Sequence, residues 1–171
     1  MSVVRRLPTG RVTADFFTPS YRFSASVLVY KRRLIDVLTD RLTDYLDLVD
    51  IYVSRINNPG DIVATYPKGS LVKQEIVFIM LPDEIEGTSK ERHFGTRDLF
   101  SIFVTVPSFE IKGQLQWGSN DLDIKKLLAS ETQAFLPLLE VNAANSLFSQ
   151  VVFQGPLALV NKAKIQVLCG T

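Results

Sequence analysis

Apolar side chains alternate with polar ones along several short stretches of this chain, and the alternation predicts β-strands. Every second residue from Tyr21 to Val29 is apolar, and from Phe109 to Trp117 every second residue is apolar or glycine. A period of two places one set of side chains on one face of a half-buried strand. A Pro-Ser pair precedes each stretch, so we expect a turn there and an earlier strand that begins near Arg11 or Leu99.

Helical spacing follows each predicted strand pair. Apolar residues three and four positions apart indicate the buried face of a short helix; they are Leu34, Val37, Leu38, Leu42 and Tyr45 in the first half, and Leu122, Ile124, Leu127, Leu128 and Phe135 in the second. Asn120 or Asp121 is a candidate N-cap of the second helix, because each side chain accepts hydrogen bonds from first-turn amides. Three more strands are predicted in each half: 46–54, 62–66 and 71–81, then 136–144, 150–154 and 157–168.

The elements recur because the sequence itself recurs. Residues 18–27 match residues 106–115 at an offset of 88, and both segments open on Pro-Ser-aromatic. Residues 71–79 match residues 160–168 at an offset of 89. Internal similarity at a fixed offset is typical of a duplicated structural unit.

We therefore predict a mainly β fold with two short helices, of the α+β class. A β-β-α-β-β-β unit is expected twice, over 11–81 and 99–169, with a linker over 82–98. Each unit is suited to a small bent sheet or a partly closed barrel, which would reduce its exposed strand edges.

The closing segment of each unit carries a resemblance to a known kind of fold. A glycine, an apolar strand, a short polar turn and a final apolar strand follow one another over 69–78 and over 154–167. This outline resembles the small β-barrels of Sm-like and SH3-like proteins, and duplicated bacterial proteins of that type whose function is uncharacterised. The resemblance implies a small barrel in each half. It does not imply RNA binding, because neither half has both the Asp–apolar–Asn loop and the basic-Gly turn of Sm-like RNA sites.

Composition and charge exclude several classes of protein. Apolar residues make up 46% of the 171 residues and charged residues 22%, as in soluble globular domains. The net charge of +1 provides no overall attraction to nucleic acid or acidic lipid. No apolar run approaches the roughly 18 residues of a membrane span, and no apolar signal segment follows Arg5 and Arg6. We expect a cytoplasmic protein without a membrane span.

Residue types that support catalysis are isolated in this sequence. His93 is the single histidine and lies in the linker, while Cys169 is the single cysteine and ends an apolar strand. Asp36, Asp40 and Asp44 have the spacing of a solvated helix face rather than of a metal site. We assign no catalytic, metal or cofactor-binding residue, expect no cofactor and no small-molecule ligand, and predict that the protein is not an enzyme.

A basic cluster is the one candidate contact site. Lys31, Arg32 and Arg33 precede the first helix and could touch phosphate or an acidic partner; the simpler interpretation is a charged turn at the start of the helix. Lys73 and Lys162 recur in the two closing turns, which we attribute to a shared turn geometry.

Two functional hypotheses follow from these observations. The first is a non-enzymatic protein-interaction or scaffold module that self-associates or binds a protein partner. The alternative is nucleic-acid binding through the basic N-terminal half.

Overall fold

The computed structural model describes residues 10–82, 98–118, 121–130 and 133–170, and these residues form a mainly β fold with two short α-helices. The first half contains β1 (Arg11–Phe17), β2 (Tyr21–Leu28), α1 (Leu34–Thr39), β3 (Tyr45–Arg55), β4 (Asn58–Val72), the 3-10 turn η1 (Lys73–Glu75) and β5 (Phe78–Leu81). The second contains β6 (Asp98–Val106), β7 (Phe109–Trp117), α3 (Ile124–Ala129), β8 (Phe135–Asn145), β9 (Val152–Asn161), the 3-10 turn η3 (Lys162–Lys164) and β10 (Val167–Gly170).

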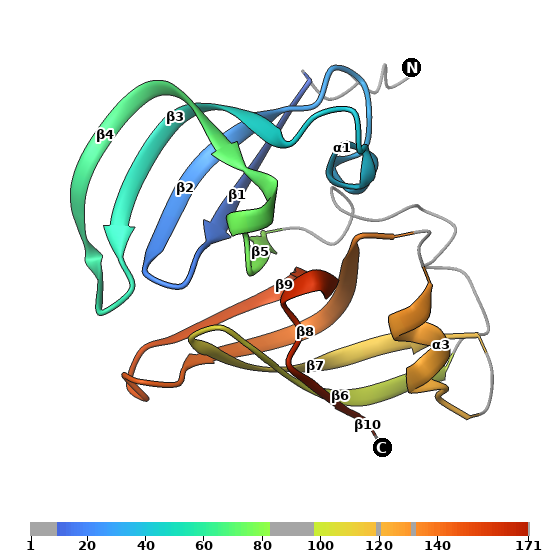
Figure 1. The fold of residues 1–171 in the computed structure, drawn as a ribbon. Coiled ribbons are helices and arrows are strands. Elements are labelled where there is room, and N and C mark those ends of the chain that lie inside the picture. The colour runs from blue at the N-terminus through green and yellow to red at the C-terminus, as the bar shows by residue number, and fades with distance from the viewer. Residues whose placement is uncertain (1–9, 83–97, 119–120, 131–132, 171) are drawn as a thin grey trace, which may run out of the picture.

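The strands form one antiparallel sheet with the order β10-β6-β7-β8-β9-β5-β1-β2-β3-β4. Its two ends do not meet, so the sheet is open, and β10 and β4 are its edge strands. In the first half, strands β2 to β4 are strongly arched (Figure 1). The expectation of a separate small bent sheet or partly closed barrel in each half is therefore corrected: the described strands of both halves form one sheet, and it does not close.

Local backbone irregularities fall at corresponding places in the two halves. The register between β2 and β3 shifts between Ser24 and Ser26, and the register between β7 and β8 shifts between Lys112 and Gln114. Opposite these bulges, Asp50 and Glu140 have positive φ angles of 52° and 50°. Such bulges bend a strand and increase its twist, so each half curves at the same point along its strands.

Several predicted boundaries are corrected by the structure. Helix α1 ends at Thr39, and Leu42, assigned above to its buried face, is 93% exposed. The N-cap of α3 is Asp123, whose carboxylate accepts a hydrogen bond from the Lys126 amide; Asp121 lies ahead of it and Asn120 is outside the described residues. Strands β4 and β9 run without the breaks predicted near Gly69 and Gly155, because both glycines remain in register with neighbouring strands.

Pairing of β5 with β9, here called the seam, joins the two halves. Residues Phe78 to Leu81 of β5 pair with Val160 to Leu157 of β9. On its other side β5 pairs with β1, so β5 lies between β1 and β9 in the middle of the sheet.

Each of the two hydrophobic cores crosses the seam. The first-half core includes Leu157 and Leu159 from β9, and the second-half core includes Phe78 and Met80 from β5. The rings of Phe17 and Phe78 stack at a centroid distance of 4.2 Å, and Phe109 meets Phe78 edge-on at 5.0 Å. Burial of apolar surface across the seam therefore holds the halves together.

Candidate functional site at the seam

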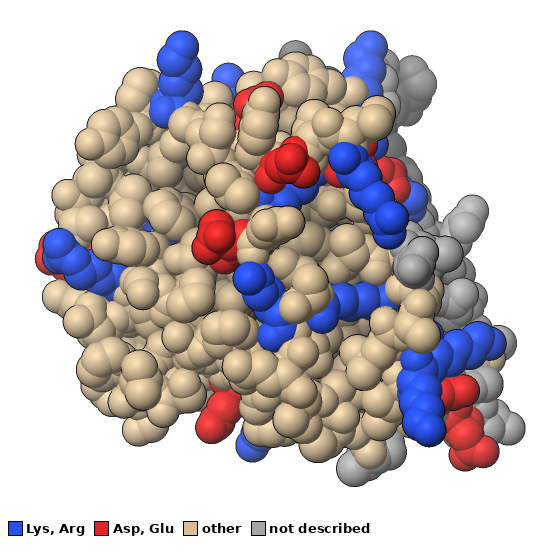
Figure 2. Space-filling view, viewed as in Figure 1, with Lys and Arg blue, Asp and Glu red and all other residues tan. Residues whose placement is uncertain are grey.

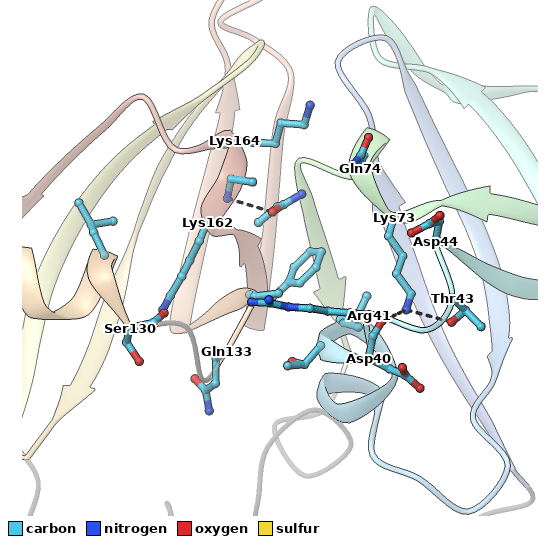
Figure 3. A pocket seen from close by; sticks show the side chains of 17 residues that line it. Asp40, Arg41, Thr43, Asp44, Lys73, Gln74, Ser130, Gln133, Lys162 and Lys164 are labelled. Atoms are coloured by element: carbon cyan, nitrogen blue, oxygen red, sulfur yellow. Dashed lines mark hydrogen bonds between the residues drawn. The ribbon is translucent and has the colours of Figure 1, made fainter.

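A pocket of about 640 Å³ opens beside the seam and is lined by residues of both halves. The first half contributes the end of α1 and the turn η1, and the second contributes the residues after α3 and the turn η3 (Figure 3). Arg41, Lys73, Lys162 and Lys164 bring positive charge to this pocket, and Asp40 and Asp44 bring negative charge. The two recurring lysines of the sequence therefore lie on opposite walls of one pocket.

Lys73 caps the C-terminal end of α1. Its Nζ donates hydrogen bonds to the carbonyl oxygens of Val37 at 2.7 Å and Asp40 at 2.8 Å, and to Thr43 Oγ1 at 3.3 Å. The last carbonyls of a helix have no partner within it, and a cation there also interacts favourably with the helix dipole. Burial lowers the pKa of the Lys73 ammonium, although the negative charge of Asp40 acts in the opposite direction.

Lys162 has the corresponding role in the second half. Its Nζ donates to the carbonyl oxygen of Ser130, the C-cap residue of α3, at 3.0 Å. Burial lowers the pKa of this ammonium as well. Figure 3 shows the side chain of Lys162 extending toward Ser130 and that of Lys73 toward Asp40 and Thr43, so each lysine reaches the helix end of its own half. Helix capping thus explains why a lysine recurs at these two positions. The interpretation from the sequence alone, a shared turn geometry, does not predict this role.

The predicted cluster of Lys31, Arg32 and Arg33 does lie at the start of α1, but its charge is largely compensated. Arg32 Nη1 contacts Asp40 Oδ2 at 2.8 Å, and Arg33 forms two hydrogen bonds to the Asp36 carboxylate, at 2.8 and 2.9 Å. These hydrogen bonds from arginine are the main reason that the pKa values of Asp36 and Asp40 are lowered. The structure therefore places two of the three cations in intrachain ion pairs.

Charges of both signs are interspersed on the face shown in Figure 2, over both halves of the molecule. No broad patch of one sign is visible there, whereas a nucleic-acid surface is usually a basic stripe or patch. The distribution agrees with the compensated arginines before α1.

Other residues considered for chemistry remain dispersed. Cys169 is exposed on β10, and His93 lies outside the described residues. Within the described ranges, no group of three or more His, Cys, Asp or Glu side chains is arranged to hold a metal ion. In the same part of the chain, no helix has the length and apolar character needed to cross a bilayer. No family model, curated protein or solved structure matches this chain.

The sequence did not predict which strands lie at the edges of the sheet. Among the described strands, β4 and β10 each have a neighbour on one side only, so one row of backbone amide and carbonyl groups on each is not paired with another of these strands. Exposed apolar side chains accompany these edges: Ile62, Tyr66 and Val72 on β4, and Val167 on β10. The sequence predicted separate strands over 62–66 and 71–81, whereas β4 is continuous from Asn58 to Val72 along the edge of the sheet.

Proposed function

We propose that the two halves are copies of one folding unit and that the chain is a non-enzymatic interaction or scaffold module that associates with further copies of itself. The shared element order, the matching bulges and the two capping lysines support the first part. Two copies of one duplicated unit are expected to share such local details, whereas two unrelated halves would rarely share so many.

Self-association is supported mainly by the edges of the sheet. Tyr66 on β4 is 61% exposed and Ile62 is 54% exposed, and neither is covered by a neighbouring strand. The space-filling view shows a broad surface with few charged side chains over β3 and β4 (Figure 2). Exposed strand edges with apolar side chains are common sites of pairing between chains.

The nucleic-acid alternative has weaker support. Of the three residues in its candidate contact site, Lys31, Arg32 and Arg33, the two arginines are paired with Asp40 and Asp36. Phosphate binding there would first have to break these ion pairs. We therefore do not propose it as the function.

Light scattering coupled to size-exclusion chromatography tests the proposal directly. The mass should rise from the 19.2 kDa of one chain as the protein concentration increases. A mass that stays at one chain over the whole accessible concentration range would contradict self-association.

A further inference from the structure

We propose that copies of this chain join head to tail, with β10 of one copy pairing antiparallel to β4 of the next in the register that β5 and β9 use within the chain. This inference rests on the proposed self-association and specifies its interface. The seam is the template for this intermolecular joint. It pairs β5, the last strand of the first half, with β9, the fourth strand of the second half. The two edge strands occupy the equivalent places: β10 is the last strand of the second half, and β4 is the fourth strand of the first half.

The register follows from the turns that adjoin the strands. η1 follows β4 and leads to β5, and η3 follows β9 and leads to β10, each at an offset of 89 residues. The exits from the turns also correspond: Val77 N donates to Phe17 O and Gln166 N donates to Thr105 O, both at 2.8 Å.

Transferring the register of the seam onto the edges predicts four intermolecular pairs. They are Val167 with Leu71, Leu168 with Ser70, Cys169 with Gly69, and Gly170 with Lys68.

The exposure of β10 fits its position at the edge of the sheet, where β6 is its one strand neighbour among the described residues. All four residues of β5 are buried, whereas Val167 at the position of Phe78 is 50% exposed and Cys169 at the position of Met80 is also exposed. Leu168 faces the other way and packs against the second-half core of its own chain. One face of β10 thus packs against the core of its own chain, and the other face is exposed.

Large and small side chains exchange places between the seam and the proposed joint of β10 with β4. At the seam, a Cβ on Gly155 would lie 2.6 Å from Met80 Sδ, so the large methionine side chain requires glycine at position 155 of β9. On β4 the position of Gly155 is occupied by Tyr66, and on β10 the position of Met80 is occupied by the smaller Cys169. A large residue has become small on one strand and a small residue large on the other, which is the change expected if the two strands meet.

The proposed joint is more polar than the seam. Leu157 and Leu159 of β9 correspond to Lys68 and Ser70 of β4, which are exposed. An edge lysine opposes strand pairing because its ammonium must be kept in water. Association is therefore expected to be reversible, in contrast to the permanent seam. Because the two contacting surfaces differ, the assembly forms a ring if the rotation between copies closes and a filament if it does not.

A disulfide trap tests the register. Asn161 N donates to Val77 O, so the alternation of an antiparallel ladder makes Met80–Ala158, and by transfer Cys169–Gly69, a pair without direct hydrogen bonds. Cα atoms in such a pair are about 4.5 Å apart, within the range of a disulfide. Gly69→Cys should therefore link to the native Cys169 of the next copy under mild oxidation. The new Cβ approaches only the flexible end of Ile51, at 2.9 Å from Cδ1.

Non-reducing electrophoresis reads the result. Gly69→Cys should give a covalent ladder beyond the dimer, whereas the matched control Ser70→Cys should not, because its side chain faces away from Cys169. The double variant Gly69→Cys with Cys169→Ser should lose the ladder. If mass rises with concentration but Gly69→Cys links no better than Ser70→Cys, the head-to-tail pairing is wrong and the proposed self-association stands. A constant monomer mass overturns both.

A second variant keeps the test decisive if Gly69→Cys does not fold. Replacing Lys68 and Ser70 by leucine restores the residues of the seam, and the dissociation constant should fall about tenfold or more. Asp61→Leu with Thr65→Leu adds the same number of leucines to β4 outside the paired segment and should leave the constant within about twofold. Equal effects of the two double variants would overturn the predicted joint.

Discussion

β5 and β10 are short strands of four residues in corresponding places, yet one is the most buried strand of the molecule and the other is mostly exposed. β5 lies between β1 and β9, and β10 lies beside β6 alone. Phe78 and Met80 consequently belong to the core of the opposite half, while Val167 and Cys169 remain exposed. The comparison shows that burial of a strand here is set by the strand beside it more than by its own composition.

The largest expected difference between the two strands is in stability. Phe78→Ala removes a fully buried ring from the aromatic cluster at the seam and should lower the free energy of unfolding by about 3–5 kcal/mol. Val167→Ala, at the corresponding edge position, should cost less than about 1 kcal/mol. Urea denaturation at a protein concentration that keeps the chain monomeric measures both values. Equal losses would show that β10 is covered in the monomer.

The next comparison is between the corresponding end residues of β9 and β4, Asn161 and Val72. Asn161 is buried, its Nδ2 donates to Ile76 O at 2.8 Å, and its Oδ1 accepts from Ala163 N at 3.1 Å. Asn161→Ala leaves buried backbone groups without partners and should cost about 1–3 kcal/mol. Val72→Ala, at the edge, should change stability by less than about 0.5 kcal/mol. Chemical denaturation tests the contrast, and a harmless Asn161→Ala would argue against a tightly closed seam.

The capping lysines should differ according to the number of their acceptors. Lys73→Met removes a buried cation that bonds two carbonyls and a hydroxyl, so a loss of about 2–3 kcal/mol is expected. Lys162→Met removes one such bond and should cost about 1 kcal/mol. Thermal or urea unfolding compares the two variants, for which methionine retains most of the apolar stem. A larger loss for Lys162→Met would contradict the capping role.

The smallest effect is a dependence on alkaline pH. Burial lowers the pKa of folded Lys162 below its ordinary value of 10.5. Between these two pKa values the unfolded chain binds more protons than the folded one, so this group makes the free energy of unfolding rise with pH. The difference in stability between the native chain and Lys162→Met should therefore increase as pH approaches 10.5. A difference that is flat or declines over this range would contradict a desolvated ammonium.

Much of the fold was predictable because its signals are local. Alternation after the two Pro-Ser turns located β2 and β7, and the three-and-four spacing located α1 and α3. The helix ends were wrong because Leu42 and Tyr45 continue an apolar spacing that the tertiary structure does not use. Lys73 and Lys162 were found by their recurrence, but their roles depend on acceptors about thirty residues away along the chain. No local pattern contains that information.

The sequence by itself determined the alternation of strands and helices, because side-chain periodicity decides which faces of each element are apolar. Only the tertiary structure decided that β5 is inserted between β1 and β9 and that β4 and β10 remain at the edges. Strand order depends on which apolar faces pack together and which strands form backbone hydrogen bonds over long distances in the sequence. Chains with similar local patterns can therefore have different strand orders. For the same reason the pocket at the seam, whose lining comes from both halves, emerges only after the halves have packed together.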